Sequence, residues 1–427
     1  MSTAAQSLPS NTIESIEALQ AHQARCRREL GYPDPTPDYP VLKLALEEAK
    51  KYENDARREG DFYRIGIFKY PAQLEPIRWQ RTYNVIKRVN PGVDESPVYL
   101  AMLARQAATV ELIITNFGLA DKKLCDACDR ILLGTTAEPS MNSECLPQFD
   151  SSWVILCNGL IDFVYQAAKA VVLSWRPKPP DPGATVSLGS TISDVESVLA
   201  EDERPLKLLL HNLHSFLFLG QPRPRKYNPP SPIYHPALSQ LTNCNERFVI
   251  AHEYGHAVFQ QLRAVGALDQ YSENRSEELD ADQFAFVATL NSSSQLDLIA
   301  PNCALQGGFF VVQCVEIIRQ AVNLVRHCKT GEDKGDGVHP PNSVRKTFLE
   351  KLYNNQHLES EGRYNLDLEG ALVPAQTLEY LWNRICDLFF HMGELGFELH
   401  PIWDNYPVSN SGIHIPRSSS TTTSGSN

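Results

Sequence analysis

The stretch that decides the functional region reads FVIAHEYGHAVF, from Phe248 to Phe259. Its two histidines, His252 and His256, stand four residues apart in an otherwise apolar segment. In an α-helix four residues make about one turn, so both imidazoles leave the same face and can reach one ion. The segment therefore predicts a buried helix that presents two nitrogen ligands to a metal.

Glu253 directly follows the first histidine and points off the line that joins the two imidazoles. From there it can touch a water on the metal without binding the metal itself, which is the position of a general base. If the spacing were an accident on a core helix, two imidazoles and a carboxylate would be buried without partners, which is costly. A metal ion supplies those partners, and we interpret the motif as a site for one catalytic Zn²⁺ ion.

A catalytic zinc needs a third protein ligand, and a second stretch, SEELDAD, begins at Ser276. On a helix Glu278 and Asp282 lie one turn apart and share a face. We predict that Glu278 is the third metal ligand and that Asp282 accepts the remaining N–H of a ligand histidine. Acids also gather at helix starts because of the helix dipole, which explains Glu277 and Asp280 and would explain all four acids without the histidine motif.

The combination of HEYGH at 252–256 with ELDAD at 278–282 resembles the gluzincin metallopeptidases. Their third-ligand motif reads E-x-x-A-D in the heat-shock and CAAX-type protease group. By this resemblance Glu278 is the zinc-binding glutamate and Asp282 the acid behind a zinc ligand, whereas Glu277 matches neither. The resemblance implies a zincin-like catalytic core and a protein or peptide substrate.

Two further stretches are similar to the same group. Trp153 to Leu160 resembles the strand and Gly-Leu turn before the zinc helix, and His339 to Arg345 resembles the downstream His-Pro...Arg segment. The similarity covers Trp153 to Leu349 in scattered islands. Members of the heat-shock and CAAX-type group are embedded in membrane, so the lack of an evident membrane helix favours the soluble repressor-cleaving peptidases of the ImmA/IrrE type, whose zinc helices are related.

The predicted reaction is the hydrolysis of a peptide bond. A zinc ion held by two neutral imidazoles and one carboxylate keeps a net positive charge, which polarises a carbonyl and lowers the pKa of bound water towards about 7. Glu253 would take the water proton and pass it to the leaving amine. The protein is thereby expected to be a zinc-dependent metalloendopeptidase.

The developing oxyanion needs a further donor, for which His339, Arg345 and Tyr254 are candidates. We place His339 in the catalytic set, although a His-Pro-Pro step before a helix often only starts that helix. Arg345 is instead expected to bind a carboxylate within the fold, with Asp336 and Asp282 as candidates.

Two alternative functions use the same residues. One is a regulatory protein that retains zinc and binds a peptide without cutting it, but simple binding requires no base such as Glu253. The other is a zinc hydrolase of a non-peptide amide, which needs a closed pocket. An unpaired strand edge beside the zinc helix would favour peptides, and we predict that Trp153 to Cys157 lies near such an edge.

The bulk composition is that of a globular protein, with 42% hydrophobic and 21% charged residues in a chain of 427. A net charge of -12 argues against nucleic-acid binding, which needs clustered Lys and Arg. No secretory signal is evident in Met1 to Asn11, and no window approaches the roughly 20 apolar residues of a membrane span. Together with ten cysteines, mostly isolated in apolar segments, this predicts a cytoplasmic protein with reduced thiols.

The expected fold class is α+β, predominantly helical, with a small sheet beside the zinc-binding helix and extra helices at both ends. Helices are predicted at Ile13–Leu30, Val41–Arg58, Pro97–Phe117, from Asn158 to near Trp175, from near Asn245, and at Ser276–Leu290, Gly308–Cys328, Pro341–Tyr353 and Thr377–Gly393. Strands are predicted at Trp153–Cys157 and Phe62–Phe68.

Four regions are predicted along the chain. Residues 1–150 form a mainly helical N-terminal region, and residues 151–355 form the metallopeptidase core. Residues 356–407 form a C-terminal helical region, and the Ser-, Thr- and Gly-rich residues 408–427 form a disordered tail. Within the core, the Pro-rich segment 220–236 is predicted to be a loop that leads into the zinc helix.

Overall fold

The computed structural model describes residues 18–19, 21, 23–25, 97–116, 126–136, 143–148, 151–177, 188–189, 191–220, 232–264, 274–295, 301–328, 340–359 and 367–403. Several predictions lie outside these residues: the helix at 41–58, the strand at 62–68, most of the loop at 220–236, the tail at 408–427 and the positions of Asp336 and His339.

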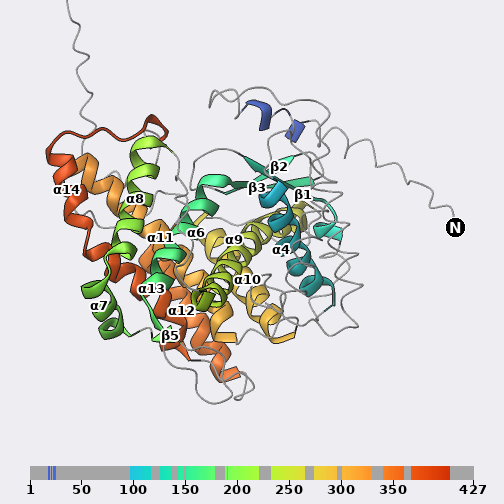
Figure 1. Ribbon diagram of the computed structural model, residues 1–427. Helices are drawn as coiled ribbons and strands as arrows, with labels where there is room; N and C mark the ends of the chain where they lie inside the picture. The colour runs from blue at the N-terminus through green and yellow to red at the C-terminus, as the bar shows by residue number, and fades with distance from the viewer. Residues whose placement is uncertain are drawn as a thin grey trace, which may run out of the picture.

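The described chain is predominantly helical with a small mixed sheet, which confirms the α+β class (Figure 1). The elements are α4 (Pro97–Asn116), β1 (Ile131–Thr136), β2 (Glu144–Gln148), β3 (Ser151–Cys157), α6 (Asn158–Leu173), β4 (Arg176–Pro177), β5 (Leu188–Gly189), α7 (Ile192–Glu201), α8 (Arg204–Leu219), η1 (Pro232–Tyr234), α9 (His235–Ala264), α10 (Asn274–Gln295), α11 (Pro301–His327), α12 (Asn342–Glu359), α13 (Leu368–Asn383), α14 (Cys386–Glu394) and η2 (Pro401–Trp403).

The main sheet has the strand order β1-β3-β2. β3 pairs with β1 in parallel and with β2 in the antiparallel direction. The prediction that Trp153 to Cys157 lies near an unpaired edge is therefore wrong, because this run is the central strand. All seven residues of β3 are buried, and a continuous apolar run is typical of a strand that is covered on both faces.

Alternate side chains of β3 pack into two different hydrophobic clusters. Val154 and Leu156 belong to the main hydrophobic core of the helices. Trp153 and Ile155 point to the opposite face of the sheet, where they pack with Leu19 of the N-terminal helical segment. The period of two in a strand produces this division, and it explains why the run from Trp153 to Ile155 has apolar side chains on both faces.

Helix α9, which carries the HEYGH motif, lies at the centre of the molecule. It contacts α4, α6, α10 and α11 and all three strands of the main sheet. In Figure 1 the sheet and α4 lie on one side of the α9–α10 pair, and α7, α8, α13 and α14 lie on the other. Because neighbours surround α9, even its polar motif residues are largely buried.

Helix α9 begins ten residues before the predicted start near Asn245. Its early turns are polar and carry little helical periodicity, but they meet polar side chains of α4. Arg105 and Gln106 donate hydrogen bonds to Asn243, and Arg247 donates one to Gln106. A tertiary polar interface thus stabilises turns that the local apolar pattern does not predict.

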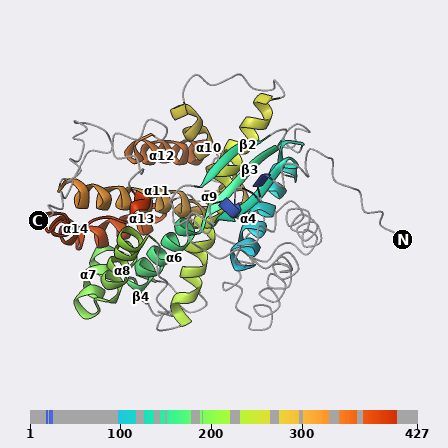
Figure 2. The same ribbon diagram turned by 90° about the horizontal axis from the view of Figure 1, so that it is seen from above.

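The other predicted helices in the described part of the chain are present and differ in their ends, whereas α7 and α8 were not predicted. The predicted helix at 377–393 is two helices, α13 and α14, which are separated at Arg384 and Ile385. Figure 2 shows α11 running alongside both of them. The ends of the segment 176–189, predicted as loop, pair as β4 and β5. In the described part of the chain the cysteines are free thiols, as expected.

Helix α11 is the one described helix that is long and apolar enough to cross a membrane, over Leu305–His327. Of its apolar window, 83% is buried inside the protein. It packs against α9, α10, α12, α13 and α14, which is the environment of a core helix.

One hydrophobic core extends from Leu103 in α4 to Trp403 in η2. It includes residues from the regions that we expect to be N-terminal, catalytic and C-terminal. The domain boundaries at 150, 355 and 407 stay predictions.

Replacing Gly307 with Ala should destabilise the protein by about 1–3 kcal/mol, because overpacking a tight crossing forces backbone shifts. Helix α11 crosses α9 at this glycine, and a Cβ there would lie 2.3 Å from the carbonyl oxygen of Cys244. The matched control is Gly370→Ala in α13, where the added Cβ would meet only the Asp367 side chain. Urea denaturation measures both changes; equal stability of the two variants would contradict the close crossing.

Candidate metal centre

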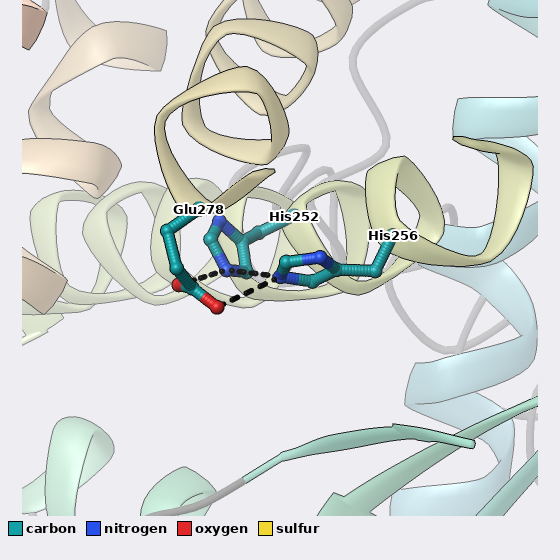
Figure 3. Close-up of side chains that lie close together, drawn as sticks. All are labelled: His252, His256 and Glu278. Carbon is teal, nitrogen blue, oxygen red and sulfur yellow. Dashed lines mark hydrogen bonds and ion pairs between the residues drawn. The ribbon is translucent and has the colours of Figure 1, made fainter. Parts of the chain in front are cut away.

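His252 and His256 leave the same face of α9, and Glu278 approaches them from the first turns of α10 (Figure 3). The Nε2 atoms of the two imidazoles are 3.2 Å apart. The Glu278 carboxylate places Oε2 3.4 Å from the Nε2 of His252 and Oε1 3.3 Å from the Nε2 of His256. Two imidazole nitrogens therefore face the two oxygens of one carboxylate.

The spacing of these donor atoms can be compared with the geometry of metal ions. A tetrahedral ion with bonds of about 2.0–2.1 Å separates its ligand atoms by about 3.3–3.4 Å. The separation of 3.2 Å between the two imidazole nitrogens is close to this value, and the distances of 3.4 and 3.3 Å join these nitrogens to the two different oxygens of the Glu278 carboxylate. One ligand atom from each of the three residues lies within 4.8 Å of the others, so the group can hold one cation.

The close approach of α10 to α9 depends on Gly255, which lies between the two histidines. A Cβ at this position would lie 3.1 Å from the Cα of Ala281. Two small residues thus allow the two helices to come together beside the site. This contact places Glu278, one turn before Asp282, within reach of both imidazoles.

A buried ion pair lies behind the first histidine. Asp282 is fully buried, and its Oδ1 lies 2.9 Å from the Nδ1 of His252. Arg345, from α12, donates two hydrogen bonds to the same carboxylate, from Nε at 2.8 Å and from Nη2 at 2.6 Å. Of the two carboxylates considered for Arg345, Asp282 is the one it binds, while Asp336 lies outside the described residues.

The second histidine has an acidic neighbour that the sequence pattern did not single out. Oε1 of Glu277 lies 3.6 Å from the Nδ1 of His256. Glu277 also pairs with Arg263, the basic residue in the last turn of α9. The available signal was the spacing of Arg263, seven residues after His256 and hence on the same helix face.

The carboxylates strongly perturb the titration of the two histidines. Burial acts to lower the pKa of His256, but its contacts with Glu277 and Glu278 and the charge of Glu253 outweigh burial and raise the pKa to about 10. The pKa of His252 is also raised, because its contacts with Asp282 and Glu278 outweigh burial. Without a metal the imidazolium form of His256 is thus favoured, and a cation at this point would displace its proton.

The acidic residues shift in the opposite direction. Burial acts to raise the pKa of Glu278, but the contacts with His252 and His256 outweigh it and lower the pKa. The contact with His256 lowers the pKa of Glu277 to about 2. Both residues therefore carry negative charge across the physiological range, as ligands or partners of a cation must.

The other predicted site residues have different surroundings. Glu253 is buried, with 7% of its surface exposed. Tyr254 is fully buried and donates its hydroxyl hydrogen to Glu111 of α4, so the structure does not bring it to the donor atoms. Arg345 is occupied by Asp282, and His339 lies outside the described residues. Neither described candidate for the oxyanion donor is thus available in this arrangement.

Strand β2 lies close to the metal-ligating face of α9. Gln260, one turn after His256, accepts hydrogen bonds from Cys145 of β2 and from Ser152 of β3. Burial, together with the charges of Glu253 and Glu277, raises the pKa of the Cys145 thiol well above its usual value. The thiol is therefore protonated at neutral pH and is a poor metal ligand.

Comparisons with known proteins give no name to this arrangement. No family model matches the chain, and searches of curated proteins and of solved structures also return no match. The site is therefore interpreted from its own geometry.

Proposed function

We propose that this protein is a zinc-dependent metalloendopeptidase with a zincin-like core, similar to the gluzincins. The single observation that carries the proposal is the convergence of His252, His256 and Glu278, whose ligand atoms lie within 4.8 Å of one another. Two imidazole nitrogens and one carboxylate oxygen are the ligand set of many catalytic zinc sites. The proposed site holds one Zn²⁺ ion in a cytoplasmic protein.

The pattern of the second helix supports the same proposal. Glu278 and Asp282 lie one turn apart on α10, and Asp282 contacts the Nδ1 of His252 while Glu278 faces its Nε2. A ligating histidine usually gives its other ring N–H to a carboxylate, which fixes the tautomer and the ring orientation. Asp282 has this relation to His252.

Bound zinc would supply Lewis-acid polarisation of a scissile carbonyl and would acidify the attacking water. Glu253 lies next to the first ligand in the same helix but is not one of the three donor residues. In the proposed mechanism its carboxylate accepts the water proton and then delivers it to the leaving amine. The burial of Glu253 favours such transfer, because a water-poor environment strengthens local electrostatic interactions.

The strand next to the site favours an extended substrate. Among the described strands, β2 is at the end of the sheet order and contacts α9. An edge strand has backbone groups that can pair with an extended peptide. This feature favours a peptide over a compact amide substrate.

Metal analysis tests the proposed site directly. We expect about one equivalent of zinc per chain in the wild type and less than about a tenth in His256→Ala, because two remaining donors bind zinc weakly. The purified proteins are dialysed after exposure to zinc, and mass spectrometry measures the zinc that they retain. The matched control is His235→Ala, which changes a histidine at the start of the same helix and should retain the metal.

A wild-type chain without stoichiometric metal would overturn the proposal. Equal zinc in the wild type and His256→Ala would place the metal elsewhere and would also contradict it.

A further inference from the structure

A carboxylate that is paired with an arginine lies beside the Nδ1 atom of each of the two histidines. We propose that Glu277 is a positioning residue for His256 and that Arg263 holds Glu277 in place. This inference rests on the proposed metal site and extends it, since the sequence pattern assigns Glu277 no role there. Its counterpart is the set formed by His252, Asp282 and Arg345.

The two imidazole rings have the same orientation relative to Glu278. Both Nε2 atoms face the Glu278 carboxylate, so both Nδ1 atoms are left to face outward. The Nδ1 of His252 meets Asp282 at 2.9 Å, and the Nδ1 of His256 meets Glu277 at 3.6 Å. A carboxylate beside each Nδ1 favours a proton on that atom, which leaves the Nε2 lone pair for the metal.

Arg263 holds the carboxylate of Glu277. Arg263 approaches Glu277 with two nitrogens: Nη1 donates a hydrogen bond to Oε2 at 3.2 Å, and Nη2 lies 3.0 Å from Oε1. A two-pronged contact fixes the plane of a carboxylate as well as its position. Arg263 lies in the last turn of α9 and Glu277 in the first turn of α10, so the pair also joins the two helices beside the site.

Helix electrostatics alone do not explain these contacts. An acid in the first turn of α10 is favourable because of the helix dipole, and a solvent-facing side chain would satisfy that effect. Glu277 instead contacts two residues of another helix, His256 and Arg263. Its side chain is 20% exposed, so solvent screens these contacts only in part.

The contacts that Glu277 makes with His256 and Arg263 are weaker than those that Asp282 makes with His252 and Arg345. At 3.6 Å the contact between Glu277 and His256 is longer than a direct hydrogen bond, so charge attraction is its main component. The Asp282 side chain is fully buried and its arginine contacts are shorter. We therefore infer that Glu277 adjusts the metal affinity, whereas Asp282 also supports the fold.

Metal affinity tests the inference without any peptide substrate. In Glu277→Gln we expect zinc affinity to fall by about 10–100-fold, the usual effect of losing such a partner. Competition with a chromophoric zinc chelator measures the dissociation constant. The visible spectrum of the Co²⁺-loaded protein should also change, because the His256 ring is no longer held, and Glu277→Asp should recover part of the affinity. The matched control is Asp280→Asn, an acid two residues from Glu278, which should bind zinc within about twofold of the wild type.

The outcomes separate this inference from the proposed site. Wild-type affinity and an unchanged Co²⁺ spectrum in Glu277→Gln would overturn the inference and leave the metal site standing. A lower melting temperature with unchanged affinity would show a structural role only and would also overturn it. A wild-type chain that binds no metal would overturn the proposed function and this inference together.

Discussion

Peptide hydrolysis should fall by about 10²–10⁴-fold in Glu253→Gln while the protein keeps its metal, because this is the usual contribution of a general base. Glutamine matches the size of glutamate but cannot accept the water proton at neutral pH. Glu253 is not one of the three donor residues, so zinc content should stay at the wild-type value. The measurement combines the cleavage rate of a quenched fluorescent peptide library with metal analysis of the same samples.

The control for this variant is Glu203→Gln, which replaces an exposed glutamate near the start of α8. It should cleave at the wild-type rate. Retention of full activity in Glu253→Gln would remove the proposed base. If the zinc-loaded wild type and the variant both fail to cleave every peptide in the library, the protein is better explained as a zinc-retaining peptide-binding protein.

The largest stability effect is expected in Arg345→Met, at about 3–5 kcal/mol, because it leaves a buried carboxylate without its cation. Asp282 is fully buried and accepts two hydrogen bonds from Arg345. Methionine fills similar space but offers neither charge nor donors. The free energy of unfolding, measured by urea denaturation of the metal-free protein, reports the change without any contribution from metal binding.

Two further variants define the origin of that effect. Lys351→Met changes an exposed cation of the same helix, α12, and should alter stability by less than about 0.5 kcal/mol. Combining Arg345→Met with Asp282→Leu removes both charges and should recover part of the lost stability, because no buried charge is left unpaired. A single variant as stable as the wild type would show that this ion pair does not support the fold.

The arrangement of the metal-binding face could be predicted from local sequence because it depends on helix geometry. His252 and His256 share a face by virtue of their four-residue spacing, and Glu278 and Asp282 do so for the same reason. In the structure, the glycine of the HEYGH motif and the alanine of the ELDAD motif, Gly255 and Ala281, make the close contact between the two helices. Local periodicity thus predicted both helices and the faces that meet.

Contacts between elements decided what the local pattern could not. The apolar run of β3 is equally compatible with a central strand or an edge strand, and only its pairing with β1 and β2 on either side makes it central. The early turns of α9 are stabilised by polar side chains of α4. The side-chain contacts between α4 and α9 join residues more than a hundred positions apart, so no local window contains them.

The sequence by itself determined the candidate donors, namely two histidines and one glutamate on two helix faces. Only the tertiary structure decided that their atoms lie 3.2–3.4 Å apart and that Glu277 and Arg263 stand behind His256. It also turned Tyr254 away from the site towards Glu111. The physical reason is that helical spacing fixes directions within one helix, whereas packing between helices fixes which side chains meet.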